Sequence, residues 1–79
     1  MTDPTPEPVT LGAYLKAQRD AANLTQETLA GRIGVSRQAV AQWEANISVP
    51  GPRALHFLAE QLPGLDPARM LALIPSGTR

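Results

Sequence analysis

QETLAGRIGVSRQAVAQWEA, residues 26–45, is the stretch that decides the fold of this 79-residue chain. It contains two short helical patterns, and a hydroxyl residue suited to capping a helix precedes each of them, Thr25 the first and Ser36 the second. Apolar side chains recur at three- and four-residue steps along one face of each pattern. We expect this inward face to comprise Leu29, Ala30 and Ile33 in the first helix and Val40 and Trp43 in the second.

The residues between these two helices suit a sharp turn. Gly34 tolerates a positive φ, and Val35 can fill the inner side of the turn. Ala30 supplies a small side chain where two steeply crossing helices approach most closely. The joint pattern predicts a helix-turn-helix, and a plain helical hairpin within a bundle is the alternative that the spacing leaves open.

The rest of the chain continues the helical pattern on both sides of this stretch. Further helices are predicted over residues 11–23, 52–62 and 67–74, with Thr10 and Asp66 as caps and with prolines or glycine at the breaks. The fold class is therefore all-α, a bundle of five short helices that forms one domain over residues 10–75. The Pro-rich residues 1–9 are expected to be a disordered tail, and residues 76–79 a frayed end.

Composition limits the classes of function. Seven Lys and Arg balance seven Asp and Glu, and the chain has no cysteine, which excludes disulfides and thiolate metal sites. It has neither an apolar run long enough to span a bilayer nor a signal-peptide pattern, so we expect a cytoplasmic protein without a membrane partner. His56 is the only histidine and lacks a surrounding catalytic set, so no enzyme activity, cofactor or metal is expected.

The run over residues 11–62 resembles the Xre/Cro family of helix-turn-helix regulators, which includes the lambda-type phage repressors. The likeness is carried by Leu15 and Arg19, by LTQETLAGRIGVSRQAVAQWE at residues 24–44, and by Pro50 and the ALHFLAEQL stretch at residues 54–62. The resemblance implies a lambda-repressor-like fold whose third helix enters the major groove of double-stranded DNA.

Residues on the outward side of that third helix are the implied base contacts: Arg37, Gln38, Ala41 and Gln42. Arginine can donate two parallel hydrogen bonds to guanine, and glutamine can pair in the same way with adenine. An ordinary solvated helix face is the alternative. No acidic residue lies on this face before Glu44, which favours the DNA-reading interpretation.

Phosphate contacts are expected from helix starts and from polar residues near them. The positions implied by the resemblance are Gln26, Ser36, Asn46, Ser48 and Arg53. Arg19 and Glu44 match a family pair that is partly buried and joins the first helix to the third, so we interpret them as a structural ion pair.

The sequence departs from the family pattern after Glu44. Asn46 and Ile47 occupy a stretch where the family usually has a glycine near a lysine or arginine, so we expect one phosphate contact to be lost. Since the net charge is also zero, we expect modest affinity and a shallow dependence on salt.

A homodimer, assembled in solution or on the DNA itself, is the expected partner arrangement, because one small domain reads only a short half-site. Candidate dimer contacts are Ile47, Val49, Met70, Leu73 and Ile74. We therefore expect a repressor that binds a pseudo-palindromic operator. The alternative is a protein-interaction module such as an antitoxin, in which DNA binding is secondary or lost.

Overall fold

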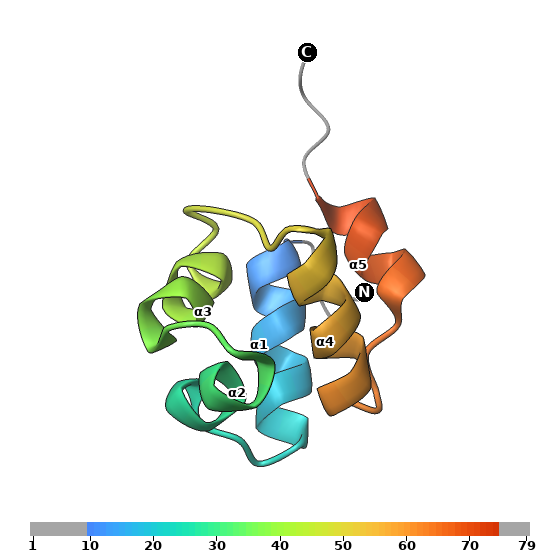
Figure 1. Ribbon diagram of the computed structural model, residues 1–79. Helices are drawn as coiled ribbons and strands as arrows, with labels where there is room; N and C mark the ends of the chain where they lie inside the picture. Colours follow the sequence, from blue (N-terminus) through green and yellow to red (C-terminus); the bar gives the residue numbers. More distant parts are fainter. Residues whose placement is uncertain (1–9, 75–79) are drawn as a thin grey trace, which may run out of the picture.

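Five helices make up the part of the chain that the computed structural model describes, residues 10–74. They are α1 (Leu11–Ala21), α2 (Gln26–Ile33), α3 (Arg37–Glu44), α4 (Pro52–Gln61) and α5 (Pro67–Leu73). No strand occurs within these residues, so the predicted all-α class is confirmed. In Figure 1, α1 runs through the middle of the molecule, with α2 and α3 to one side and α4 and α5 to the other. None of these helices is long and apolar enough to cross a membrane.

The helix boundaries differ from the predicted ones at three places, the smallest being α4, which ends at Gln61 instead of Leu62. α1 ends at Ala21 instead of near Asn23. α5 ends at Leu73, so the prediction that Ile74 belongs to the helix is wrong. Ile74 is extended, with ψ at 128°, because the ring of a following proline disfavours helical backbone in the residue before it. The expectations for residues 1–9 and 75–79, including a helix end at Pro75, lie outside the described residues.

Four of the five helices begin with a side chain that caps the first turn. Thr10, Thr25, Ser36 and Asp66 each accept a hydrogen bond from a backbone N–H two or three residues later. Such a bond satisfies one of the backbone donors that have no partner inside the helix. α4 begins differently, with Gly51 as the N-cap residue, no side-chain cap and Pro52 in the first turn.

The first three helices end in the same way. Asn23, Gly34 and Asn46 adopt positive φ values of 61°, 77° and 62°. In each case the next N–H reaches the carbonyl five residues before it, for example Val35 N to Ala30 O at 3.0 Å. This is the Schellman ending, which reverses the chain within one residue and favours glycine or asparagine at that residue. The turn predicted at Gly34 is therefore confirmed.

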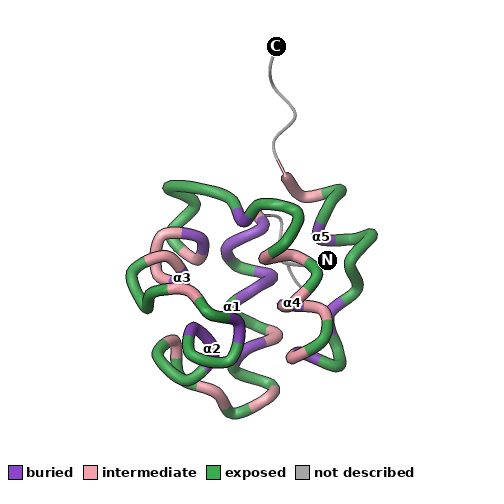
Figure 2. Tube along the Cα trace, viewed as in Figure 1, coloured by how far each residue is buried: buried purple, intermediate pink, exposed green. Residues whose placement is uncertain are grey.

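The core lies where the inner faces of the helices meet (Figure 2). The largest side chains with less than 2% of their surface exposed are Leu15, Leu29, Val40, Leu58, Leu62 and Met70. The expected inward residues Ala30, Ile33 and Trp43 are also buried, and Val35 packs against them half-buried. Leu65, which the helical periodicity does not include, is buried in the connection before α5.

α1 approaches the end of α3 so closely at Gly12 that any side chain at this position would collide with the backbone of α3. A Cβ atom added to Gly12 would lie 2.7 Å from the carbonyl oxygen of Trp43 and would also meet the backbone of Glu44. The Gly12 N–H donates to Asn46 Oδ1 at 3.0 Å, which holds the two backbones together. Glycine is therefore required here by contact between helices, which no local sequence pattern signals.

A buried ion pair joins α1 to α3. Arg19 donates from Nε to Glu44 Oε2 at 2.6 Å and from Nη2 to Glu44 Oε1 at 3.1 Å, so the contact is bidentate. Its Nη1 donates to the Leu24 carbonyl at 2.7 Å. The two side chains are only 10% and 5% exposed. The hydrogen bond with Glu44 raises the pKa of Arg19 against the opposing effect of burial.

A second, exposed ion pair extends this contact along α1. Lys16 Nζ lies 2.9 Å from Asp20 Oδ2, and the hydrogen bond from Lys16 lowers the pKa of Asp20. Because the pKa of this carboxylate is lowered on folding, the contact stabilises the fold at pH values above the ordinary pKa of aspartate. Its contribution is lost as the pH falls through the folded-state pKa.

We expect Arg19→Ala to lower the free energy of unfolding by about 3–5 kcal/mol, because it leaves the Glu44 carboxylate buried without its partner. Urea titration followed by circular dichroism measures the change. Lys16→Ala, on the same helix, removes only an exposed partner and should leave the stability nearly unchanged. Equal losses of unfolding free energy in the two variants would contradict a special role for the buried ion pair.

We expect Gly12→Ala to destabilise the fold by about 1–3 kcal/mol, since the new methyl group must push α1 away from α3. Gly31→Ala is the matched control. A Cβ at Gly31 meets nothing within 4 Å, so alanine should stabilise α2 by up to about 1 kcal/mol. Thermal melting of both variants checks whether the two changes in stability have opposite signs. A stabilised Gly12→Ala variant would exclude the close contact.

Candidate nucleic-acid interface

The outward side of α3 carries the four predicted base-contacting residues. Arg37 and Gln38, in the first turn, are exposed, and Ala41 and Gln42, one turn later, are half-buried. Val40 and Trp43 are buried on the opposite side, against the core. The amphipathic character of this eight-residue helix therefore presents one short polar strip to solvent.

The capping residues set where this strip begins. Ser36 Oγ accepts from the Ala39 N–H at 3.0 Å, so α3 starts at Arg37. Only Gly34, Val35 and Ser36 separate it from α2, and the left-handed Gly34 makes the sharp change of direction. The first turn of α3, with Arg37 and Gln38, thus follows directly on the turn between the helices.

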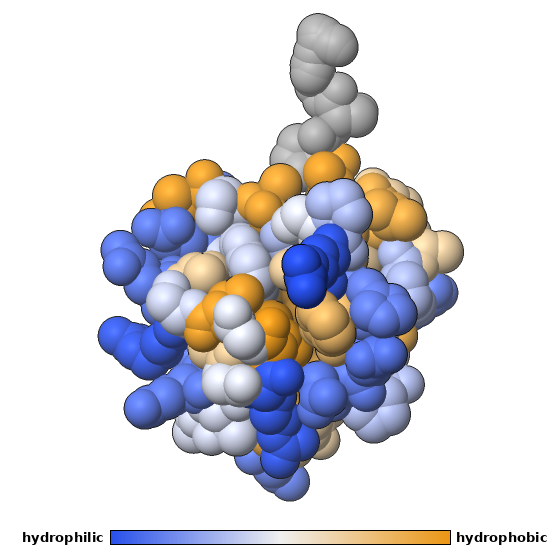
Figure 3. All heavy atoms as spheres, viewed as in Figure 1, coloured by the Kyte–Doolittle hydropathy of each residue, from blue (hydrophilic) through white to orange (hydrophobic). Residues whose placement is uncertain are grey.

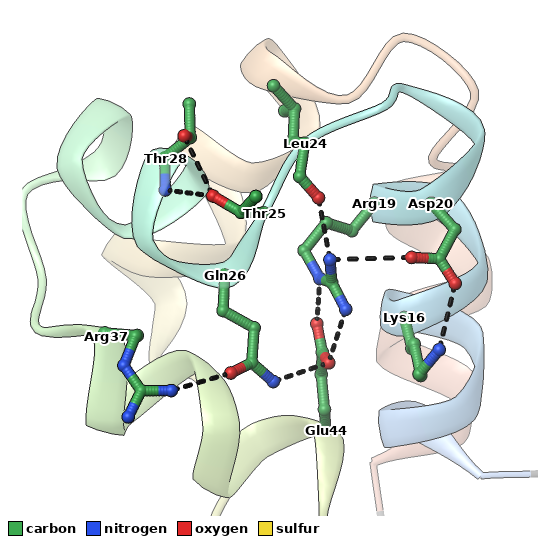
Figure 4. Close-up of polar contacts among 9 residues, drawn as sticks. All are labelled: Lys16, Arg19, Asp20, Leu24, Thr25, Gln26, Thr28, Arg37 and Glu44. Atoms are coloured by element: carbon green, nitrogen blue, oxygen red, sulfur yellow. Dashed lines mark hydrogen bonds and ion pairs between the residues drawn. The ribbon is translucent and has the colours of Figure 1, made fainter.

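Gln26, in the first turn of α2, links this strip to the buried ion pair (Figure 4). Its Nε2 donates to Glu44 Oε1 at 3.0 Å, and its Oε1 accepts from Arg37 Nη1 at 3.2 Å. An amide has two N–H donors, so one donor of Gln26 has no partner among these contacts and is available to a phosphate. Sequence reasoning predicted Gln26 as a phosphate contact, which stays a prediction, and missed both of these hydrogen bonds.

The other predicted phosphate contacts differ in how they are placed. Ser48, in the loop after α3, and Arg53, in the first turn of α4, are exposed. Asn46 instead points its amide toward α1, where Oδ1 accepts from the Gly12 N–H and Nδ2 donates to Thr10 Oγ1 at 3.3 Å. Asn46 therefore ties two helices together, which sequence reasoning did not predict; one N–H of its amide has no partner among these contacts, so its phosphate contact stays a prediction.

The cations are not equally available at the surface. Lys16 and Arg19 lie in ion pairs with Asp20 and Glu44. Three other arginines are exposed and form no ion pair within the described residues. They lie one each on α2, α3 and α4: Arg32, Arg37 and Arg53. Each ion pair neutralises one basic and one acidic group, and α2 and α4 also carry the exposed Glu27 and Glu60. Arg37 is therefore the one of these three arginines whose helix has no exposed acidic side chain.

Figure 3 shows exposed apolar groups over the α3–α4 loop and over α5, and a further apolar area near the centre of the view. Ile47 is 71% and Val49 45% exposed, so both candidate dimer residues of the loop are at the surface. Met70 has no exposed surface, and its prediction as a dimer contact is wrong, because it faces the core from α5. Leu73 and Ile74 are half-buried, whereas the neighbouring Leu71 is 58% exposed.

His56 lies outside this interface and takes part in one exposed contact. Its Nε2 is 3.2 Å from Glu60 Oε2, one turn along α4. Among the described residues, no group of three or more His, Cys, Asp or Glu side chains is arranged to hold a metal ion.

Comparison with known proteins matches the geometry to a family. A helix-turn-helix family model matches residues 15–68, which is more than half of the chain. The crystal structure of the P22 c2 repressor protein in complex with a synthetic operator aligns with a TM-score of 0.72 and 28% identity, covering 77% of this chain and 91% of that one. The solution structure of the DNA-binding domain of the P22 c2 repressor aligns with the same TM-score and 27% identity, covering 86% and 91%.

No sequence among the curated proteins matches the chain. The family model nevertheless spans the helix-turn-helix together with its supporting helices, from within α1 to the start of α5. The chain therefore belongs to the helix-turn-helix family, in its Xre/Cro-type, lambda-repressor-like form, whose members are DNA-binding regulators and not enzymes.

Proposed function

We propose that this protein is a sequence-specific regulator that binds double-stranded DNA with α3 in the major groove. The observation that carries the proposal is the polar strip on α3, with Arg37 and Gln38 exposed in its first turn and Gln42 one turn later. The similarity to a repressor solved on a synthetic operator supports it. In this family the first residues of the second motif helix are the ones that reach base edges.

The chemistry of the strip fits the edges of base pairs. Arg37 has N–H groups left for guanine after its contact with Gln26, and Gln38 and Gln42 can each pair with adenine. Ala41 offers a methyl group suited to an apolar contact with thymine. Each bidentate pair is worth roughly 1–3 kcal/mol of discrimination between bases.

Backbone contacts would come from the helix starts that flank the strip. Gln26 at the start of α2 retains one amide donor, Ser36 begins α3, and Arg53 lies in the first turn of α4. The start of α4 has no side-chain cap, so its first N–H groups can donate to an anion. These contacts would fix the position of α3 without reading sequence.

A dimer on a pseudo-palindromic operator, acting as a repressor, completes the proposal. A helix of eight residues reads only a few base pairs, and two-fold repetition lengthens the site. The exposed Ile47 and Val49 of the loop after α3 are the contacts we favour between two copies, and Leu73 and Ile74 offer a second, half-buried set.

The exposed Ile47 and Val49 also favour a second candidate function. Two apolar side chains on one loop are typical of a protein-binding surface, so the domain would act as an interaction module such as an antitoxin. Under that function, the polar strip of α3 would not select a DNA sequence.

Selection from randomised duplex DNA at low salt, followed by sequencing, tests the proposal. We expect enrichment of a pseudo-palindromic site, and Gln38→Ala should change the preferred base at one position in each half-site by roughly 5- to 150-fold. Ala17→Ser on the exposed side of α1 is the control and should select the same site. Failure of the wild-type protein to enrich any sequence would sink the regulator function and favour the interaction module.

Few cations lie near α3, so we expect the affinity for DNA to depend only weakly on salt concentration. One substitution should make this dependence stronger. Ser48→Lys adds a charge to the exposed loop without replacing an apolar dimer residue, so log K plotted against log salt should become steeper by roughly 0.9 per subunit, with tighter binding at low salt. Ala17→Lys adds the same charge on α1, which packs behind α3, and should change the slope little. Fluorescence anisotropy at several salt concentrations measures both slopes, and equal steepening would show that the loop after α3 is not near phosphate.

A further inference from the structure

A cavity opens to solvent between the turn of the helix-turn-helix and α4. Its volume is about 550 Å³, and sites that hold small molecules measure roughly 300–1,000 Å³. Ile33 and Val35 line one side, Ala54 and Phe57 line the other, and Arg53 is also part of the lining. None of the base-contacting residues of α3 lines this cavity, so it is separate from the strip that reads DNA.

The walls of the cavity are apolar and are held in place by the core. Ile33 belongs to the buried core, and Val35, Ala54 and Phe57 pack against it while part of their surface stays accessible. None of the described residues that line the cavity is acidic. The apolar area near the centre of Figure 3 lies over this part of the molecule, where Figure 1 shows the turn beside α4. A ligand with an apolar body would be stabilised here by displacing water from these walls.

A positive charge lies beside the apolar walls. Arg53 is exposed, and it forms no ion pair with any described residue. A guanidinium only donates hydrogen bonds, and a carboxylate is an acceptor that matches two of its parallel N–H groups. The cavity therefore combines apolar walls with an arginine whose charge has no partner.

The first turn of α4 adds two backbone donors to the same side of the cavity. No side chain caps this helix, Pro52 has no N–H, and the Leu55 N–H already donates to the Gly51 carbonyl at 2.9 Å. The N–H groups of Arg53 and Ala54 are among those that a helix start leaves without a partner inside the helix. Both residues line the cavity, so these N–H groups support the same anion that the Arg53 side chain attracts.

We propose that this cavity binds a small carboxylic acid with an apolar body, whose carboxylate pairs with Arg53 and whose body covers the walls at Val35 and Phe57. An inorganic anion would pair with Arg53 but leave the walls in contact with water. A neutral apolar molecule would cover the walls but leave the guanidinium without a partner. A ligand that carries both groups satisfies both parts of the cavity.

The bound acid would also act on DNA binding, and this second part of the inference rests on the proposed function. The Arg53 side chain and the first N–H groups of α4 are proposed phosphate contacts. A carboxylate held by these donors would occupy the place of a DNA phosphate and repel the neighbouring ones. The acid would therefore weaken the affinity for the operator.

NMR titration of the whole chain with phenylpropionate tests the binding site. Phenylpropionamide, which has the same shape without the charge, and acetate, which has the charge without the apolar body, are the comparison ligands. We expect phenylpropionate to shift the methyl signals of Ile33 and Val35 and the side-chain signal of Arg53. It should bind about tenfold more tightly than either comparison ligand.

Arg53→Gln should reduce the affinity for phenylpropionate about tenfold, to that of the amide. Arg32→Gln is the matched control, because Arg32 is an exposed arginine without an ion pair that does not line the cavity, and its affinity should be unchanged. Both arginines are exposed, so both variants should fold, and their amide spectra check this.

Fluorescence anisotropy with the selected DNA tests the effect on DNA binding. Saturating phenylpropionate should weaken the affinity and make the plot of log K against log salt shallower by roughly 0.9 per subunit, because one phosphate contact is lost. Phenylpropionamide should change neither quantity. Arg53→Gln should show the shallower slope without ligand and should no longer respond to the acid.

The failures of the inference and of the proposed function are distinguishable. Equal affinities for the acid and the amide, an unchanged affinity in Arg53→Gln, or no shifts at millimolar phenylpropionate would each overturn the binding site. Binding of the acid without weaker DNA binding would overturn the effect on the operator. A wild-type protein that selects no DNA sequence would remove the proposed function, and the NMR titration would then still decide whether the cavity binds the acid.

Discussion

The Arg19–Glu44 ion pair is the interaction on which the arrangement of the first three helices depends. A buried pair adds little net stability, because removing two charges from water offsets their attraction. An unpaired buried charge is far less favourable, so α1 and α3 can pack only in the register that brings these side chains together. Arg19 also holds the Leu24 carbonyl just before α2, and Glu44 accepts from Gln26 within it. One contact thereby orients both helices of the motif against α1.

A close backbone contact and an amide support the same arrangement at the other end of α1. Gly12 lets the start of α1 meet the end of α3, and the side chain of Asn46 accepts a hydrogen bond from the Gly12 N–H in that first turn. Asn46 combines this role with the left-handed backbone that ends α3. Near the far end of the bundle, the Tyr14 hydroxyl accepts from the Asp66 N–H at 2.9 Å and joins α1 to the start of α5. α1 is thus the central support of the domain.

A net charge of zero does not by itself decide whether a polyanionic partner is attracted. The ion pairs of α1 and α3 each remove one basic and one acidic group, and exposed carboxylates accompany the exposed arginines of α2 and α4, so Arg37 on α3 is the arginine with no exposed acidic side chain on its own helix. Charge distribution, which composition does not report, decides whether such a partner is attracted. Ile47, exposed in the loop after α3, contributes no charge to that surface.

The sequence by itself determined the local structure: the five helices, the capping residues, the turn at Gly34 and the division of α3 into a buried and a polar face. These follow from periodicity and from the preferences of single residues, which act over a few positions along the chain. Only the tertiary structure decided which partners meet across helices. It joined Asn46 to α1, buried Met70 while exposing Leu71, required glycine at position 12, and joined Gln26 to Arg37. Such contacts depend on the register and separation of packed helices, which no local pattern encodes.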